Sequence, residues 1–269
     1  MPVPCARVLE ALRQLCPPRL ALQGDATGLQ LGDPARPVAR VLCALDLTAA
    51  VAEEARAWGA ELVVSHHAAI FRPLEALRED EARGRLLCEL VRAGTMVYVP
   101  HTALDVVEGG TNDWLAAAVG IAAPEVLDPT LREPGQPPRG IGRVGALTRP
   151  ETVRALATRL QAATGAPAVR VAARDLDAPV SRAAVLAGDG RRWLKKAAQA
   201  GAQALVTGEA DHHTGLEARE LGLALIDLGH WASEKQAAAL LAEGLRARLQ
   251  GEPLEVRESA VATQPFAWV

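Results

Sequence analysis

The sequence has no pair of cysteines spaced as C-x-x-C, although it contains four cysteines in 269 residues. Cys5, Cys16, Cys43 and Cys88 are scattered along the chain, which argues against a zinc knuckle. In a reducing compartment, thiols spaced in this way stay unbridged and pack as small apolar groups. We therefore predict buried free thiols rather than disulfides.

A strong excess of charge of one sign and long apolar runs are also absent. The formal net charge is −3 and the pI is near 6.1, so the overall balance favours neither nucleic acid nor an anionic membrane as a partner. The segment 1–18 has no apolar core of the length that a signal peptide needs, and no later stretch has the length to span a bilayer. We expect a cytoplasmic protein without a membrane partner.

What the chain does contain is an alternation of two kinds of segment, with 49% apolar residues overall. Short runs of Val, Leu and Ile alternate with Ala-rich amphipathic stretches, which is typical of an α/β protein. Strands are predicted at 38–46, 61–65, 96–100, 182–188, 204–208 and 223–229. Helices are predicted at 4–16, 48–58, 79–93, 111–119, 151–164, 191–200 and 232–248.

A segment dense in Pro and Gly, DPTLREPGQPPRG at 128–140, interrupts this alternation. Such composition is typical of a connection between two parts of a fold. We therefore predict a first α/β lobe over 1–127 and a second over 128–228. The segment 229–269 is expected to return to the first lobe and complete a site between the two.

The two halves resemble each other in sequence. Residues 53–67, EEARAWGAELVVSHH, align without gaps on residues 195–209, KKAAQAGAQALVTGE. This alignment places Gly59 on Gly201 and His67 on Glu209. The spacing His-x-x-x-Asp at 101–105 also returns as His-x-x-x-Glu at 230–234. The chain is thus predicted to contain a duplicated α/β unit.

Histidines and acidic residues follow the apolar runs, at the points where strands should end. His66 and His67 follow LVVS, His101 follows VYVP, Glu209 ends LVTGE, and His230 follows LIDLG. Ligands gather at the carboxyl ends of strands in α/β sheets, and a turning backbone can aim two neighbouring side chains at one point. Imidazole with carboxylate suits zinc, manganese, iron, cobalt or nickel. With at least five candidate ligands from both halves, the pattern suits two ions that share bridging carboxylates.

These residues resemble the Nif-three-like dinuclear metal-centre proteins, also known as type 2 GTP cyclohydrolase I homologues. The resemblance covers nearly the whole chain. It is carried by SHHAAIF, HTALDVVEGGTND, GRVGAL, VTGEADHH, LIDLGHWASEK and the terminal Pro265-Phe266. One departure is in QGDATGLQLGD at 23–33, where Asp25 is present but the aromatic residue and asparagine common in the family are not.

The resemblance implies two divalent metal ions per subunit, bound by His66, His67, Asp105, His230 and Glu234. It implies that His101 and Glu209 lie near the metals, as proton carriers or as groups that contact the ligands. Two α/β lobes and a toroidal homohexamer with its metal sites facing an inner cavity are implied as well.

Three functional hypotheses follow. A metal-dependent hydrolase would use metal-activated water on a nucleotide or another phosphoester, with GTP suggested by the family name alone. The alternative is a non-enzymatic metal-storage, metal-delivery or regulatory hexamer, which would not need Glu209 and His101 beside the ligands. DNA binding inside a ring is geometrically conceivable, but the acidity of the chain argues against nucleic acid as a partner.

Other motifs favour structural roles. His212 and His213 are expected early in a helix, where they line a cavity or meet a neighbouring subunit. GIGRVG at 140–145 matches the dinucleotide fingerprint, but it follows a Pro-rich segment and its glycines alternate as in a strand. GRRWLKK at 190–196 and EGGTND at 108–113 are weak candidates for phosphate contact.

Overall fold

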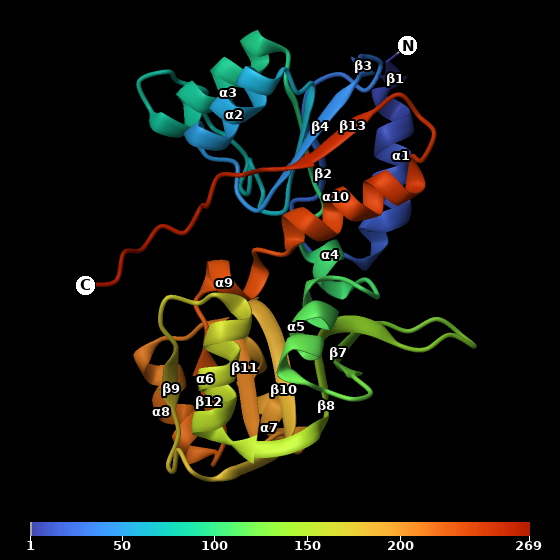
Figure 1. Cartoon of the computed structure of the whole chain (residues 1–269). Helices are drawn as coiled ribbons and strands as arrows, with labels where there is room; N and C mark the ends of the chain where they lie inside the picture. Colours follow the sequence, from blue (N-terminus) through green and yellow to red (C-terminus); the bar gives the residue numbers. More distant parts are fainter. Residues whose placement is uncertain (1) are drawn as a thin grey trace. The chain divides into compact units, whose positions relative to one another are not determined.

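The computed structural model describes residues 2–269, and the chain divides into two compact units (Figure 1). The first unit combines Met1–Val107 with Gln236–Gln264, and the second consists of Glu108–Lys235 with Pro265–Val269. Each unit is an α/β layer structure around its own sheet, so the predicted α/β class is confirmed.

The sheet of the first unit has five strands in the order β13-β4-β5-β6-β2. These strands are β13 (Glu255–Glu258), β4 (Arg40–Ala44), β5 (Leu62–Ser65), β6 (Met96–Val99) and β2 (Gly28–Leu31). The first four run parallel, whereas β2 pairs antiparallel with β6. A separate two-stranded sheet joins β1 (Val3–Pro4) to β3 (Pro37–Val38).

Helices cover both faces of this sheet. The helices are α1 (Cys5–Leu15), the 3-10 helix η1 (Pro18–Leu20), α2 (Ala49–Trp58), α3 (Ala82–Ala93), α4 (Thr102–Val106) and α10 (Ala237–Arg248). Figure 1 shows α2 and α3 on one side of β4, and α1 and α10 on the other. Because both faces are covered, the central strands β4, β5 and β6 are buried almost throughout, as expected for parallel strands.

The sheet of the second unit has six strands in the order β7-β8-β10-β11-β12-β9. These strands are β7 (Glu125–Leu131), β8 (Arg139–Thr152), β10 (Pro179–Asp189), β11 (Ala204–Glu209), β12 (Ala224–Asp227) and β9 (Arg170–Ala172). The central strands β10, β11 and β12 are parallel, and the flanking strands pair antiparallel.

Two apolar clusters pack on the opposite faces of this second sheet. The helices are α5 (Thr111–Val119), α6 (Val153–Thr164), η2 (Arg191–Trp193), α7 (Leu194–Gln199), α8 (His212–Glu220) and α9 (His230–Glu234). Val206 of β11 packs in the cluster with α5 and α6, while its neighbour Leu205 packs in the cluster with α7 and α8. This alternation follows from the two-residue period of a strand.

The repeat detected in the sequence corresponds to the same local structure in each unit. Helix α2 ends at Gly59 with φ +74°, and the aligned Gly201 after α7 also has φ +74°. Both positions are left-handed, which favours glycine because it has no Cβ. In each unit the next strand leads to a site residue, His67 beyond β5 and Glu209 at the end of β11. A five-residue helix, α4 or α9, follows the third parallel strand.

The segment 128–140 is not a linker, which corrects the sequence-based interpretation. Its first residues belong to β7, which forms a hairpin with β8 inside the second unit. Prolines are tolerated there because β7 is an edge strand of the sheet. The division between the units lies at 107/108 and the return at 235/236, whereas the predicted divisions were at 127/128 and 228/229.

The cysteines are free thiols, as predicted, with Cys5, Cys16 and Cys43 buried and Cys88 partly exposed. Burial raises the pKa of Cys5 to about 11 and that of Cys16 to about 12. These two thiols therefore stay protonated at neutral pH. Within residues 2–269, the structure contains no helix that is both long and apolar enough to cross a membrane.

Candidate metal centre

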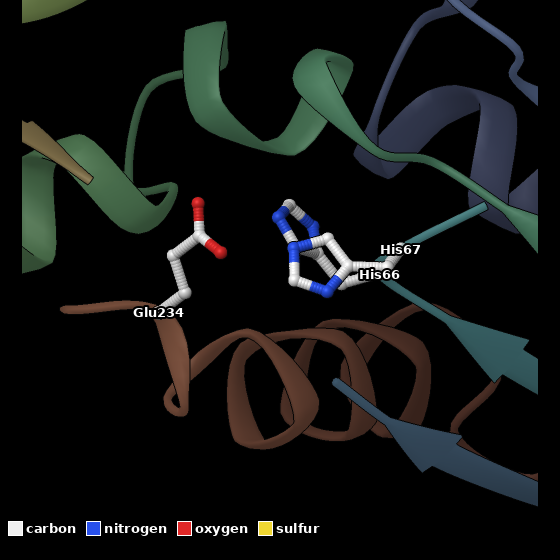
Figure 2. Close-up of side chains that lie close together, drawn as sticks. All are labelled: His66, His67 and Glu234. Carbon is white, nitrogen blue, oxygen red and sulfur yellow. The ribbon is translucent and has the colours of Figure 1, made fainter. Parts of the chain in front are cut away.

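His66 and His67 lie directly beyond β5, where the chain leaves the sheet. Their backbone N–H groups donate to the carbonyls of Ala44 and Leu45, both at 2.9 Å, so the backbone stays fixed past the end of the strand. The two ring centroids are 4.9 Å apart at 47°. Figure 2 shows both imidazoles turned to the same side, which explains how two adjacent residues can serve one site.

His66 faces a carboxylate of the same unit. Its side chain is fully buried, and its Nε2 lies 3.7 Å from Oδ1 of Asp105 in α4. This separation exceeds a hydrogen bond, which has N···O distances of about 2.7–3.2 Å. It is close to the spacing of two donors on one ion, roughly 3–3.6 Å for bonds of about 2.1 Å.

The ring of His67 contacts the carboxylate of Asp46, which follows β4. The Nδ1 of His67 is 2.7 Å from Oδ1 of Asp46, and the other carboxylate oxygen accepts a hydrogen bond from Thr263. Histidines that bind metals commonly donate their second ring N–H to a carboxylate, which fixes the tautomer and the ring. The contact with Asp46 makes Nε2 the ring nitrogen of His67 that would bind an ion.

His101 repeats this pattern at the end of β6. Its Nδ1 is 2.5 Å from Oδ1 of Asp25, and Asp25 also accepts hydrogen bonds from the backbone and side chain of Thr102. Within residues 2–269, His101 is the only residue other than glycine with positive φ, at +39°. Strained backbone of this kind persists where surrounding contacts enforce it, commonly at functional sites. The His101 ring lies 5.6 Å from the ring of His66 and 5.8 Å from that of His67.

The second unit carries its own imidazole and carboxylates around His230, the first residue of α9. Nε2 of His230 is 2.9 Å from Oε2 of Glu234, one helical turn later. Its Nδ1 is 3.0 Å from Oε2 of Glu209 at the end of β11. Glu234 is buried, whereas His230 and Glu209 are partly exposed. His230 therefore lies between two carboxylates, of which Glu209 occupies the position that Asp46 has for His67.

Helix α9 is fixed by close contacts with β10 and β11. The hydroxyl of Ser233 accepts a hydrogen bond from the Gly188 N–H at 3.0 Å and donates to the His230 carbonyl at 2.8 Å. A Cβ on Gly188 would lie 2.2 Å from Oε1 of Glu234, so a side chain at this position would displace the carboxylate. The absence of a side chain at Gly188 therefore allows the Glu234 carboxylate to lie close to β10.

Arg191 organises the acidic groups beyond Glu209. It forms ion pairs with Asp189 at 2.7 Å, Glu209 at 3.2 Å and Asp211 at 3.4 Å. Burial alone would raise the pKa of Asp189, but hydrogen bonds from Arg191 outweigh this effect and lower it. Glu209 is therefore held by a cation on one side and contacts the imidazole of His230 on the other.

Three of these side chains, His66, His67 and Glu234, form a group that could hold a metal ion (Figure 2). Two imidazoles with a carboxylate match the donor preference of zinc and other late first-row divalent ions. The residues therefore fit a metal by the chemistry of their donor atoms. The number and identity of the ions remain predictions.

The positions of the predicted site residues are clear within each unit. The first unit places His66, His67, His101 and Asp105 near the carboxyl ends of β5 and β6, and the second places Glu209, His230 and Glu234 around α9. Asp46 and Asp25 were missed as partners of histidine. Asp46 could have been found, because it follows an apolar strand as His66 and Glu209 do.

The remaining motifs have structural roles in the second unit. GIGRVG lies inside β8, as its alternation predicts. In EGGTND, Asp113 accepts two hydrogen bonds from the buried Arg143, and the Asn112 side chain accepts the Ala187 N–H. In GRRWLKK, Lys195 pairs with Glu217, and Lys196 pairs with Asp128. His212 and His213 are exposed in the first turn of α8.

Fold and site together define a protein of two related α/β units that carry imidazole and carboxylate groups at strand ends. A model of the Duf34/NIF3 (NGG1p interacting factor 3) family matches residues 3–265, and the chain belongs to this family.

Relatives of this chain carry the description "GTP cyclohydrolase 1 type 2 homolog". One from Streptococcus pneumoniae is 32% identical over 267 residues, covering 97% of this chain and 98% of the relative. Another from Streptomyces coelicolor is 35% identical over 268 residues, covering 97% and 93%. A solved Bacillus cereus protein related to NIF3 superposes with a TM-score of 0.91 at 25% identity, covering 97% of this chain and 98% of that one.

Proposed function

We propose that the protein binds two divalent metal ions through His66, His67, Asp105, His230 and Glu234 and acts as a metal-dependent hydrolase. The observation that carries this proposal is the pairing of each unit's imidazoles with carboxylates. In the first unit, Nε2 of His66 faces Asp105 and Nδ1 of His67 contacts Asp46. In the second unit, Nε2 of His230 faces Glu234 and its Nδ1 contacts Glu209. A carboxylate on Nδ1 of a histidine is typical of a group that supports a metal ligand.

The chain's own residues fix the ligands before any ion binds. Asp46 and Glu209 hold the Nδ1 atoms of His67 and His230, so that neither ring can rotate without losing a hydrogen bond. The burial of His66 and Asp105 excludes water from one side of the site. Divalent ions in a site of this kind act as Lewis acids and lower the pKa of bound water to about 7.

We assign proton transfer to His101 rather than to Glu209. Glu209 contacts both Arg191 and His230, which suits a residue that positions the imidazole. His101 has its Nδ1 on Asp25 and is partly exposed, so its Nε2 can exchange a proton with a substrate. Asp25 fixes the orientation of the ring through this contact.

The substrate class that we propose is a nucleotide-like phosphoester, supported by the description of the curated relatives as homologues of a GTP cyclohydrolase. We also propose a toroidal homohexamer. Light scattering of the purified protein tests the assembly, and a mass close to one chain of 28.3 kDa would contradict it.

The function is tested by elemental analysis of freshly purified protein together with a panel of nucleotides and phosphoesters. We expect about two ions per chain and turnover of at least one compound, which a chelator abolishes and divalent metal restores. Glu234→Gln should lower metal content and turnover together. Glu217→Gln, which removes a partly exposed carboxylate paired with Lys195 in the same unit, should change neither.

The same experiment separates the hydrolase from a storage or regulatory protein. Fully loaded protein that turns over no member of the panel contradicts the hydrolase. Purified protein that takes up no divalent ion contradicts the metal centre itself.

A further inference from the structure

The loop that carries His66 and His67 continues to Phe71 and is clamped just before it. The Gln30 side chain in β2 accepts the Ile70 N–H at 2.7 Å and donates to the Ile70 carbonyl at 3.1 Å. One carboxamide thus takes both backbone groups of a single residue, as a neighbouring strand would. Gln30 also donates to the Ala26 carbonyl at 3.1 Å, so its own position is fixed.

A second contact holds the same loop from α3. Arg83 donates to the carbonyls of Ala68 and Ala69, which precede Ile70. The backbone from His66 to Ile70 is therefore bound at several points, and the direction in which Phe71 leaves it is determined. The contacts of Gln30 and Arg83 with this loop go to the backbone of residues 68–70 and to none of the proposed metal ligands.

Phe71 is an exposed aromatic residue whose ring lies beside that of His101. It is 61% exposed, whereas most aliphatic residues of this unit are buried. Its ring meets that of His101 edge to face, with centroids 6.1 Å apart at 88°. Because His101 meets the ring at a right angle and the residue is 61% exposed, most of the ring surface is available. An aromatic face held next to polar groups is suited to stack a flat ring.

We propose that Phe71 is a specificity-determining residue that stacks on a planar heteroaromatic ring of the substrate, and that Gln30 is its positioning residue. This inference rests on the proposed function of the same site. Stacking on Phe71 places the ring beside His101, the group to which we assign proton transfer. The site then selects ring-bearing compounds over phosphoesters of similar charge without a ring.

The test compares two ligands on zinc-loaded full-length protein by titration calorimetry: guanosine 5′-monophosphate, and ribose 5-phosphate as the matched ligand without a ring. Wild-type protein should prefer the nucleotide. Phe71→Leu, which keeps an apolar side chain, should weaken nucleotide binding about tenfold and leave ribose 5-phosphate unchanged. Phe71→Trp should retain the preference. Gln30→Ala should reduce nucleotide binding in the same selective way, at unchanged zinc content.

Leu77 provides the matched control, because it is an exposed apolar residue that follows Phe71 by six positions. Leu77→Ala should leave both affinities as they are. Light scattering of each variant shows whether Phe71 serves an assembly instead. A changed assembly with an unchanged preference for the nucleotide overturns the proposal.

Two further outcomes overturn it: a wild-type protein that binds the nucleotide no better than ribose 5-phosphate, and a Phe71→Leu variant that loses both ligands equally. The proposed hydrolase fails on a different measurement, turnover of the panel by loaded protein. A ring preference that depends on Phe71 without any turnover would support this inference and contradict the hydrolase.

Discussion

At the scale of single residues, the site is built from histidines whose Nδ1 atom contacts a carboxylate. His67 has Asp46, His101 has Asp25 and His230 has Glu209. A carboxylate in this position selects the tautomer with the proton on Nδ1, so Nε2 is the nitrogen that would bind an ion or carry a proton. The three pairs lie near strand ends in both units, so the contact between Nδ1 of a histidine and a carboxylate recurs in the two duplicated halves.

Asp25 should make the stability of the protein depend on pH. Burial alone would raise the pKa of Asp25, but hydrogen bonds with His101 and Thr102 outweigh it and hold the pKa below its usual 3.8. A carboxylate with a lowered folded-state pKa stabilises the fold above its unfolded-state pKa, and this stabilisation is lost as the pH falls through the folded-state value. Asp25→Asn should thus cost about 1–3 kcal/mol at neutral pH, because His101 and Thr102 lose a charged acceptor.

The measurement is thermal unfolding of metal-free wild type and variant between pH 7 and pH 3. The gap between their melting temperatures should be constant above about pH 4 and should narrow as the pH falls below 3.8. Asp33→Asn, at an exposed turn of the same unit, should show little effect at any pH. A gap that stays constant down to pH 3 would exclude Asp25 as the titrating group.

The sequence predicted the histidines better than their partners for a physical reason. Histidine is rare in this chain, so four of its six rings placed directly after apolar strands form a visible pattern. Carboxylates are common on any surface, and Asp25 lies 76 positions from the imidazole that it contacts. Contacts over such distances depend on how strands pair, which local sequence does not reveal.

At the scale of elements, the lack of a side chain at Gly188 allows β10 to pack closely against α9. Gly188→Ala should lower metal content although every proposed ligand remains. The added Cβ would lie 2.2 Å from Oε1 of Glu234 and 3.2 Å from Nε2 of His230, so the carboxylate must move. The residue also has φ +67°, where a side chain costs about 1–2 kcal/mol in backbone strain.

Gly201→Ala is the control that has the backbone strain of a side chain at positive φ but not the steric contact with Glu234. Gly201 has φ +74°, but a Cβ there would meet nothing within 4 Å. Both variants should therefore lose a similar amount of stability in urea unfolding, and only Gly188→Ala should lose metal by elemental analysis. Equal metal content in the two variants would show that the contact with Glu234 does not matter.

The elements themselves were largely predictable, with one instructive exception. The parallel strands and the helices that precede them follow from apolar period and composition, and β5 and β11 lie within one residue of their predicted bounds. The density of Pro and Gly in 128–140 predicts a connection between units. Pro and Gly are equally common in hairpin loops, so this composition does not distinguish a linker from a hairpin. Whether it is one or the other depends on the pairing of β7 with β8, a non-local contact.

At the scale of the whole molecule, each unit has its own sheet and its own buried apolar residues, so each can fold around its own core. The chain nevertheless passes from the first unit to the second and back, with β13 returning to pair with β4. This return explains why the first unit cannot be cut out as a continuous segment. The composition of linker-like segments alone does not reveal that the chain returns to the first unit.

If the protein binds ions through the proposed ligands, removing the ions should destabilise the fold. An ion that binds only the folded state at a free concentration 100 times its dissociation constant contributes about 2.7 kcal/mol. For a chain of this size, that corresponds to a melting temperature higher by roughly 5–10 °C. Chelation of loaded protein should therefore lower the melting temperature by this amount. In Glu234→Gln the effect should be much smaller, whereas Glu217→Gln should respond as the wild type does. Unchanged melting after chelation, with metal loss verified by elemental analysis, would mean that the ions do not stabilise the folded protein.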